Sequence, residues 1–218
     1  MPRILLSFLL LLVACNAVAL DYYWVGDGGN WSDYASHWAT TSGGSTFHAQ
    51  VPTSMDAVFF DSNSFTTSGQ VVVTDLTIVY CSDFNWAGAA GGTELHNNNQ
   101  LHIHGGMYVH ATFNVPFNVL GSIYFKGSGN IDLGGVDLEY QSIYFDAIQG
   151  IWEFANDFTT QAGVTLINGT LSTAGFDLTA RGFQCTQGTG TLNLGASNVY
   201  LSAGGGSGTW NVDGSLTL

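Results

Sequence analysis

The sequence predicts an all-β protein: a single-stranded, right-handed parallel β-helix of about 20 residues per coil, with an aromatic cap at its N-terminal end. Three observations predict this fold. The string Ser-Ile-Tyr-Phe occurs at 122–125 and again at 142–145. A second pattern (Gly, any residue, apolar, any residue, then apolar or Thr) recurs at similar intervals. Apolar residues alternate with polar ones at period two, which indicates strands, and no segment keeps a helical period. The second pattern begins at Gly129, Gly150, Gly169, Gly190 and Gly208.

One unit of the repeat holds three short apolar pairs, at 131–133, 136–138 and 143–145, separated by Gly or polar corners. Three short strands per coil describe a β-helix whose coils stack about 4.8 Å apart. A β-propeller needs roughly 40 residues per blade and fits less well. The number of residues per coil varies along the chain, whereas a left-handed β-helix is built on strict multiples of six residues. This variation favours the right-handed form.

The repeat places the two cysteines that follow the N-terminal segment. Phe125, Phe145, Leu166 and Cys185 fall in one column at spacings close to one coil, so Cys185 is predicted to be a small buried residue. Cys81 precedes it by four or five coils, about 20 Å at the interstrand spacing. Because a disulfide needs Cα atoms within about 7 Å, we predict no Cys81–Cys185 bond.

The N-terminal segment 1–19 reads as a secretory signal peptide. Arg3 supplies a positive start, the segment 4–14 is apolar, and Ala17-Val18-Ala19 resembles a cleavage site. A competing interpretation is a bacterial lipoprotein signal, in which Cys15 becomes the lipidated N-terminus. Either interpretation predicts an extracellular or cell-surface protein, and no later stretch is apolar enough to span a membrane.

The charge composition limits the kinds of partner that the chain can bind. Beyond Ala19 the chain keeps Lys126 and Arg181 against sixteen acidic residues. Neutralising phosphates needs several basic residues, so nucleic acid is excluded as a partner, as is attraction to anionic lipid. The surface must consist mainly of uncharged polar residues.

Residues 20–92 do not follow the repeat, whereas residues 93–218 do. The earlier region holds four of the six tryptophans: Trp24, Trp31, Trp38 and Trp86. The open end of a β-helix exposes unpaired strand edges and needs a cap. We therefore predict a capping region at 20–92, followed by the β-helix repeats.

The N-terminal motifs carry a resemblance to a known group. The segment YYWVGDGGNWSDYASHWATTSGG is similar to a module that opens secreted β-solenoid proteins of Bacteroidota-type bacteria, and to autotransporter-associated β-strand repeats. The resemblance implies an extracellular β-solenoid with a surface, adhesive or matrix role. The motif residues are Trp24-Val25-Gly26, Gly29-Asn30-Trp31-Ser32, His37-Trp38, Ser42-Gly43-Gly44, Pro52, 56–61 and Asn63-Ser64-Phe65.

Asp137, Asp157 and Asp177 recur at a constant interval close to one coil and are expected to form an outward ladder. Solvent alone offsets their repulsion in the simplest interpretation. The alternatives are a Ca²⁺ site, since clustered carboxylate oxygens suit that ion, or the carboxylates of a polysaccharide hydrolase or lyase. We expect no enzyme activity and no resident cofactor, because the basic residues that would grip an acidic polysaccharide are missing.

Two sets of outward residues offer other contacts. Tyr108, Tyr124, Tyr144 and Tyr200 are predicted to point outward, with Tyr124 stacked on Tyr144, either as a stabilising ladder or as a glycan contact. His102 and His104 alternate with apolar residues, and we interpret them as a polar strand face. The alternative is a metal site formed by His102 and His104 together with His96 or His110.

Asn30 and Asn168 begin N-glycosylation sequons, which matter only in a host that glycosylates. The sequence therefore predicts a secreted structural or adhesive β-helix that contacts glycans or associates with itself. The alternatives are a polysaccharide-active enzyme, or a filament subunit that stacks through its C-terminal coil at Leu218.

Overall fold

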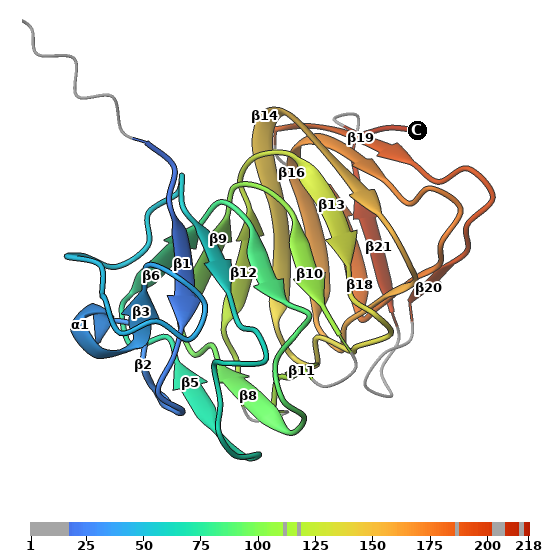
Figure 1. The fold of residues 1–218 in the computed structure, drawn as a ribbon. Coiled ribbons are helices and arrows are strands. Elements are labelled where there is room, and N and C mark those ends of the chain that lie inside the picture. Colours follow the sequence, from blue (N-terminus) through green and yellow to red (C-terminus); the bar gives the residue numbers. More distant parts are fainter. Residues whose placement is uncertain (1–17, 111–112, 117–118, 186–187, 202–207, 214–215) are drawn as a thin grey trace, which may run out of the picture.

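The chain forms a parallel β-solenoid of about seven turns with almost no helix, which confirms the predicted fold class. The computed structural model describes residues 18–110, 113–116, 119–185, 188–201, 208–213 and 216–218. The predicted signal peptide, apart from Val18 and Ala19, lies outside this part, and so does Cys15. Each full turn runs through three sides of the solenoid, here called sides 1, 2 and 3 (Figure 1).

Side 1 carries the identical Ser-Ile-Tyr-Phe strings, which pair residue for residue in parallel. The first and third positions of each string point outward, while the second and fourth point into the solenoid. Side 1 consists of β6 (Ile78–Cys81), β9 (Gln100–Ile103), β12 (Ser122–Phe125), the first parts of β14 (Ser142–Phe154) and β16 (Gly163–Ser172), β18 (Gly182–Cys185) and β21 (Thr209–Val212).

Side 2 joins side 1 in one 15-stranded sheet, because β14 and β16 run across the corner between them. Four copies of the Gly-led pattern, those that begin at Gly129, Gly150, Gly169 and Gly190, lie on this side, whereas the copy at Gly208 leads into β21 on side 1. Side 2 consists of β1 (Asp21–Trp24), β4 (Ala57–Phe59), β7 (Phe84–Trp86), β10 (Met107–Val109), β13 (Gly129–Asp132), the second parts of β14 and β16, β19 (Thr189–Asn193) and β22 (Leu216–Thr217).

Side 3 has two shorter stacks, one of four strands and one of three. The first is β2 (Gly29–Asn30), β5 (Val71–Val73), β8 (Thr93–His96) and β11 (Phe113–Asn114). The second is β15 (Phe158–Thr159), β17 (Leu178–Ala180) and β20 (Val199–Leu201).

The coil length varies along the axis. Ile78 pairs with Gln100 and Gln100 with Ser122, whereas the coil from Ser122 to its partner Ser142 is slightly shorter than either. The strands stay in register while the loops between them change length. The parallel stacking of coils crosses the boundary that we expected between residues 92 and 93. On the N-terminal side of that boundary, β5 pairs with β8 and β6 pairs with β9.

The core is a set of stacked apolar columns inside the solenoid. The predicted column is confirmed from Phe125 to Leu166: Phe125 pairs with Phe145, their ring centroids lie 4.9 Å apart, and Phe145 pairs with Leu166. Cys81 pairs with Ile103 and Ile103 with Phe125, so Cys81 begins the column in which Cys185 lies five coils later. Both thiols are buried, and five coils separate them by roughly 24 Å, too far for a disulfide.

Aromatic side chains close the N-terminal end. Trp24, Trp31 and Trp38 are fully buried, and Trp38 makes edge contacts with both of the others at 4.9 and 4.8 Å. The ring of His37 lies parallel to Trp24 at 4.5 Å. His37 ends the short helix α1 (Tyr34–His37), which leads into β3 (Trp38–Ala39). Since β3 runs antiparallel to β1 along its outer edge, it ends the parallel stack there.

A buried polar column lies where side 3 turns into side 1. Asn97 accepts a hydrogen bond from the Thr74 hydroxyl at 3.0 Å and donates to Gln141 Oε1 at 2.7 Å. Gln141 donates in turn to the carbonyl of Val119 at 2.7 Å. These amides link successive coils and satisfy polar groups that burial would otherwise leave unpaired.

Among the described residues, no helix combines the length and the apolar character that crossing a bilayer requires.

Candidate functional site

The outward residues of side 1 form a tyrosine column along the solenoid axis. Tyr80 pairs with His102, His102 with Tyr124, and Tyr124 with Tyr144. The four residues point outward because their neighbours on each strand are the buried residues of the core columns. The tyrosine column is therefore a direct consequence of the strand period and the coil register.

The rings of the tyrosine column contact one another. Tyr124 and Tyr144 stack at 4.5 Å with only 10° between their planes, as predicted. His102 lies 4.8 Å from Tyr124, and Tyr80 meets His102 edge-on at 5.4 Å. Because Tyr124 and Tyr144 cover each other's ring faces, they present ring edges and phenol hydroxyls to a ligand rather than an open stacking platform.

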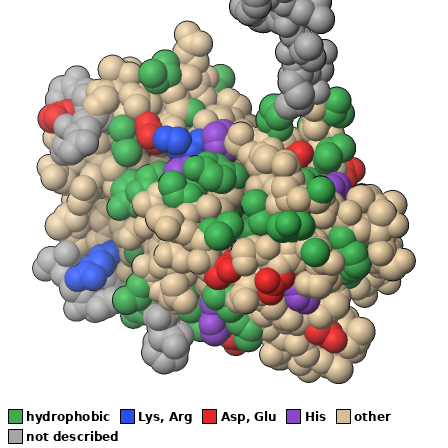
Figure 2. All heavy atoms as spheres, turned by 90° about the vertical axis from the view of Figure 1, so that its left-hand side faces the viewer, with side chains coloured by type: hydrophobic (Ala, Val, Ile, Leu, Met, Phe, Trp, Pro, Cys, Tyr) green, Lys and Arg blue, Asp and Glu red, His purple; other side chains and the backbone are tan. Residues whose placement is uncertain are grey.

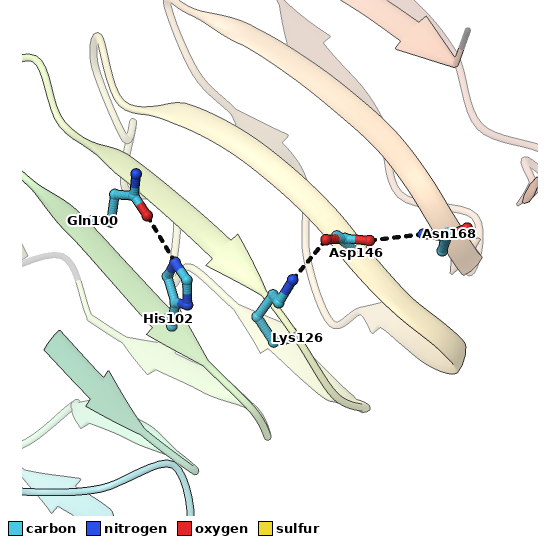
Figure 3. Close-up of polar contacts among 5 residues, drawn as sticks. All are labelled: Gln100, His102, Lys126, Asp146 and Asn168. Atoms are coloured by element: carbon cyan, nitrogen blue, oxygen red, sulfur yellow. Dashed lines mark hydrogen bonds and ion pairs between the residues drawn. The ribbon is translucent and has the colours of Figure 1, made fainter. Parts of the chain in front are cut away.

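A charged network lies beside the tyrosine column (Figure 3). Lys126 Nζ contacts Asp146 Oδ2 at 2.6 Å, and Asn168 Nδ2 donates to Asp146 Oδ1 at 2.8 Å. Lys126 directly follows β12, while Asp146 belongs to β14 and Asn168 to β16, so the Lys126–Asp146–Asn168 network crosses three coils. Figure 2 shows a basic side chain between acidic and histidine side chains, next to a group of hydrophobic side chains.

The network fixes the charge of its carboxylate. Partial burial alone raises the pKa of Asp146, but hydrogen bonds from Lys126 and Asn168 and the charge of Lys126 outweigh it. The pKa of Asp146 is therefore held below its ordinary value. At neutral pH the surface carries a fixed ammonium–carboxylate pair whose charges cancel.

The histidines of side 1 are uncharged at neutral pH. Partial burial, followed by the nearby charges of Lys126 and His104, lowers the pKa of His102 to about 4. Burial and Lys126 also lower the pKa of His104. His102 Nε2 lies 3.1 Å from Gln100 Oε1, and this contact needs a proton on that nitrogen. We call the tyrosine column, the Lys126–Asp146–Asn168 network and Gln100 together the aromatic–polar surface.

The histidines considered as metal ligands are distributed over different sides. His96 belongs to β8 on side 3 and lies 2.8 Å from Glu94 Oε2. His110 is exposed beyond β10 on side 2, away from the outward His102 and His104 of side 1. Within the residues that the structure describes, no group of three or more His, Cys, Asp or Glu side chains has the arrangement to hold a metal ion.

The aspartate ladder has a different register from the one expected. Asp157 and Asp177 do follow each other, because Phe158 pairs with Leu178. Asp137 instead pairs with Thr159, beyond Asp157. The coil is longer at this point, so a uniform spacing gave the wrong alignment, and the three carboxylates do not form one ladder.

Hydrogen bonds from the following coil occupy these carboxylates. Asp157 Oδ1 accepts from the backbone N–H of Asp177 at 2.9 Å, and Asp177 Oδ1 accepts from that of Asn198 at 2.8 Å. Asp137 Oδ2 accepts from Gln161 Nε2 at 2.6 Å. Each of the three carboxylates therefore has a hydrogen-bond donor on the next coil.

The two sequons lie in different surroundings. Asn30 is exposed at the end of β2 on side 3. Asn168 belongs to the aromatic–polar surface, and its amide nitrogen, the atom that glycosylation modifies, already donates to Asp146. A glycan on Asn168 would disrupt the Lys126–Asp146–Asn168 network.

Sequence reasoning identified Tyr124 and Tyr144 but missed the ion pair beside them. The signal was present, because Lys126 and Asp146 directly follow the two identical Ser-Ile-Tyr-Phe strings. Equal positions in strings one coil apart become neighbours across the sheet. Tyr80 and Gln100 were missed because they lie in the region where the repeat is weak.

Comparison with family models, with curated proteins and with solved structures gives no match. The resemblance to secreted β-solenoid proteins of Bacteroidota-type bacteria therefore stays a prediction from the N-terminal motifs.

Proposed function

We propose that this chain is an extracellular structural and adhesive β-solenoid that contacts glycans through its aromatic–polar surface. The observation that carries the proposal is the Lys126–Asp146–Asn168 network beside the stacked Tyr124 and Tyr144. The signal-like N-terminus, the scarcity of charged residues and the resemblance of the N-terminal motifs support an extracellular location.

The chemistry of this surface suits a polyhydroxylated ligand. Carboxylate, ammonium and amide groups lie side by side, so they can accept from and donate to neighbouring hydroxyl groups of a sugar. The phenol groups of the tyrosine column add amphipathic edges. Successive rungs lie about 4.8 Å apart along the axis, so an extended polymer lying along the axis would meet one polar or aromatic side chain of this surface at each rung.

We propose a binding role rather than a catalytic one. Hydrolysis of a glycosidic bond needs two carboxyl groups with separate roles as acid and as base or nucleophile. In the aromatic–polar surface Asp146 is ion-paired with Lys126, which suits a positioning role and not proton donation. Incubation with neutral and acidic polysaccharides should release no reducing ends, and their release would contradict this part of the proposal.

The binding role is tested with the mature chain and insoluble neutral polysaccharides. We expect saturable binding that Asp146→Asn weakens, because Asn cannot pair with the Lys126 ammonium. Tyr144→Phe should weaken it as well, since it removes one phenol hydroxyl and keeps the ring stack. Tyr200→Phe is the matched control, because Tyr200 is exposed on side 3. Equal binding by all three variants would contradict the proposed surface.

The extracellular location is tested separately in the cell that makes the protein. Fractionation and surface labelling should find the chain outside the cytoplasm, with an N-terminus at Leu20 or a lipid on Cys15. Recovery of the intact chain from the cytoplasm alone would contradict the proposal.

A further inference from the structure

A groove lies at the corner where side 1 turns into side 2. Between Asp146 and Ile151, β14 has four residues, whereas β16 has one residue between their partners Asn168 and Thr170. The extra residues of β14 cannot stay in the ladder, so the segment bulges outward. Ile148 at the bulge is 84% exposed, and Gln149 has a left-handed backbone with φ of 64°.

The bulge forms a wall, and a column of threonines lies beside it. Thr170 pairs with Thr191, and Thr191 pairs with Thr217, so the three residues follow one another across three coils. Together with Thr189 they line a groove of about 400 Å³ against Ile148 and Gln149. The other described residues of the lining are Gly169 and Gly190. The volume is in the range of small-molecule sites, roughly 300–1,000 Å³.

The side-chain polar groups of the groove have no hydrogen-bond partner among the described residues. Within the described part of the chain, none of the four threonine hydroxyls and no atom of the Gln149 amide forms a side-chain hydrogen bond. The backbone of the site is nevertheless fixed, because the Thr189 N–H donates to Asn168 Oδ1 at 3.2 Å. Hydroxyl and amide groups next to the Ile148 side chain are suited to a ligand with both hydroxyl and C–H surfaces.

We propose that this groove binds a neutral oligosaccharide. Its hydroxyls would bond to the threonines and Gln149, and one C–H face of a sugar ring would pack on Ile148. None of the described side chains that line the groove is ionisable, and the chain carries a net charge of −13, which disfavours an anionic ligand. The proposal shares its ligand class with the proposed function and rests on it to that extent, but it assigns a separate site.

The test uses the full mature chain with labelled threonine methyl groups and three probes: cellohexaose, mannohexaose and xylohexaose. At least one hexasaccharide should shift the methyl signals of Thr170, Thr191 and Thr217 in a saturable manner. An oligogalacturonate of equal length should bind more weakly because it is anionic.

Valine variants remove each hydroxyl and keep the shape and the strand preference. Thr170→Val and Thr191→Val should each weaken binding roughly fivefold, and the double variant roughly 25-fold, since one net hydrogen bond is worth about 1 kcal/mol. Thr179→Val is the matched control, because Thr179 points outward on side 3. It should leave binding unchanged.

The outcomes separate this inference from the proposed function. Binding that Tyr144→Phe weakens and the valine variants do not would overturn the groove and leave the aromatic–polar surface in place. Binding that only the valine variants weaken would support the groove and contradict the aromatic–polar surface. No binding of any hexasaccharide would overturn the groove, while binding to insoluble polysaccharides would still decide the proposed function.

Discussion

Lys126 and Asp146 occupy the same position in neighbouring coils, and their side chains meet at 2.6 Å across the sheet. The Lys126 ammonium is one of only two basic side chains beyond Ala19, in a chain with sixteen acidic residues. Its placement beside the tyrosine column puts one of these rare basic side chains into an ion pair on side 1 of the solenoid. The ion pair, the neutral histidines and the stacked tyrosines make this side chemically distinct.

The ion pair predicts a pH dependence in the acid range. The pKa of Asp146 is below its ordinary value, so its contribution to stability is present at neutral pH and is lost as pH falls through the folded-state pKa. Asp146→Asn should lower the free energy of unfolding by about 1 kcal/mol at pH 7, a typical value for a favourable pair near the surface. Urea titrations at several pH values measure the difference between the two proteins, which should disappear as pH falls through the folded-state pKa of Asp146.

The lowered pKa of His102 predicts that stability also depends on pH in a second, higher pH range. The pKa of His102 is about 4 in the folded chain, whereas an unfolded histidine titrates near 6.5. The unfolded state therefore takes up the proton first, and stability should fall as pH decreases from about 6.5 to 4. His102→Phe should remove this part of the dependence. Titration of the His102 ring signals by NMR measures the pKa directly, and a value above 6 would contradict the expectation.

The sequence predicted the parts of this fold that hydrogen bonding between coils enforces. Phe125 and Phe145 must coincide because the strands pair in register, and Tyr124 and Tyr144 must then stack outside. The loops between strands do not pair in register, so their lengths vary from coil to coil. A constant period therefore predicted the wrong partner for Asp137, which pairs with Thr159 rather than Asp157. The groove escaped prediction for the same reason. Four residues of β14 stand opposite one of β16, and no average period reveals such a bulge.

The stack of Tyr124 on Tyr144 should contribute measurable coupling energy. Aromatic pairs in this geometry are worth about 0.5–1.5 kcal/mol beyond their buried area. A double-mutant cycle of Tyr124→Ala and Tyr144→Ala, followed by urea unfolding, should give a coupling in this range. A cycle of Tyr124→Ala with Tyr200→Ala is the control, because these residues lie on different sides and should couple by less than about 0.5 kcal/mol. Equal coupling in both cycles would refute a specific stacking contribution.

The buried amide of Asn97 predicts a large effect from a small change. Asn97 is 0% exposed, and it bonds to the Thr74 hydroxyl and to Gln141. Asn97→Ala leaves Gln141 Oε1 buried without this donor, which costs about 1–3 kcal/mol, and leaves the Thr74 hydroxyl with only its longer hydrogen bond to the His96 carbonyl at 3.4 Å. The free energy of unfolding should therefore fall by at least about 1 kcal/mol. Asn98 offers a matched control, since it is the adjacent residue of the same type and is exposed. Asn98→Ala should change stability by less than about 0.5 kcal/mol, and similar losses in both variants would show that the polar column does not stabilise the turn between sides 3 and 1.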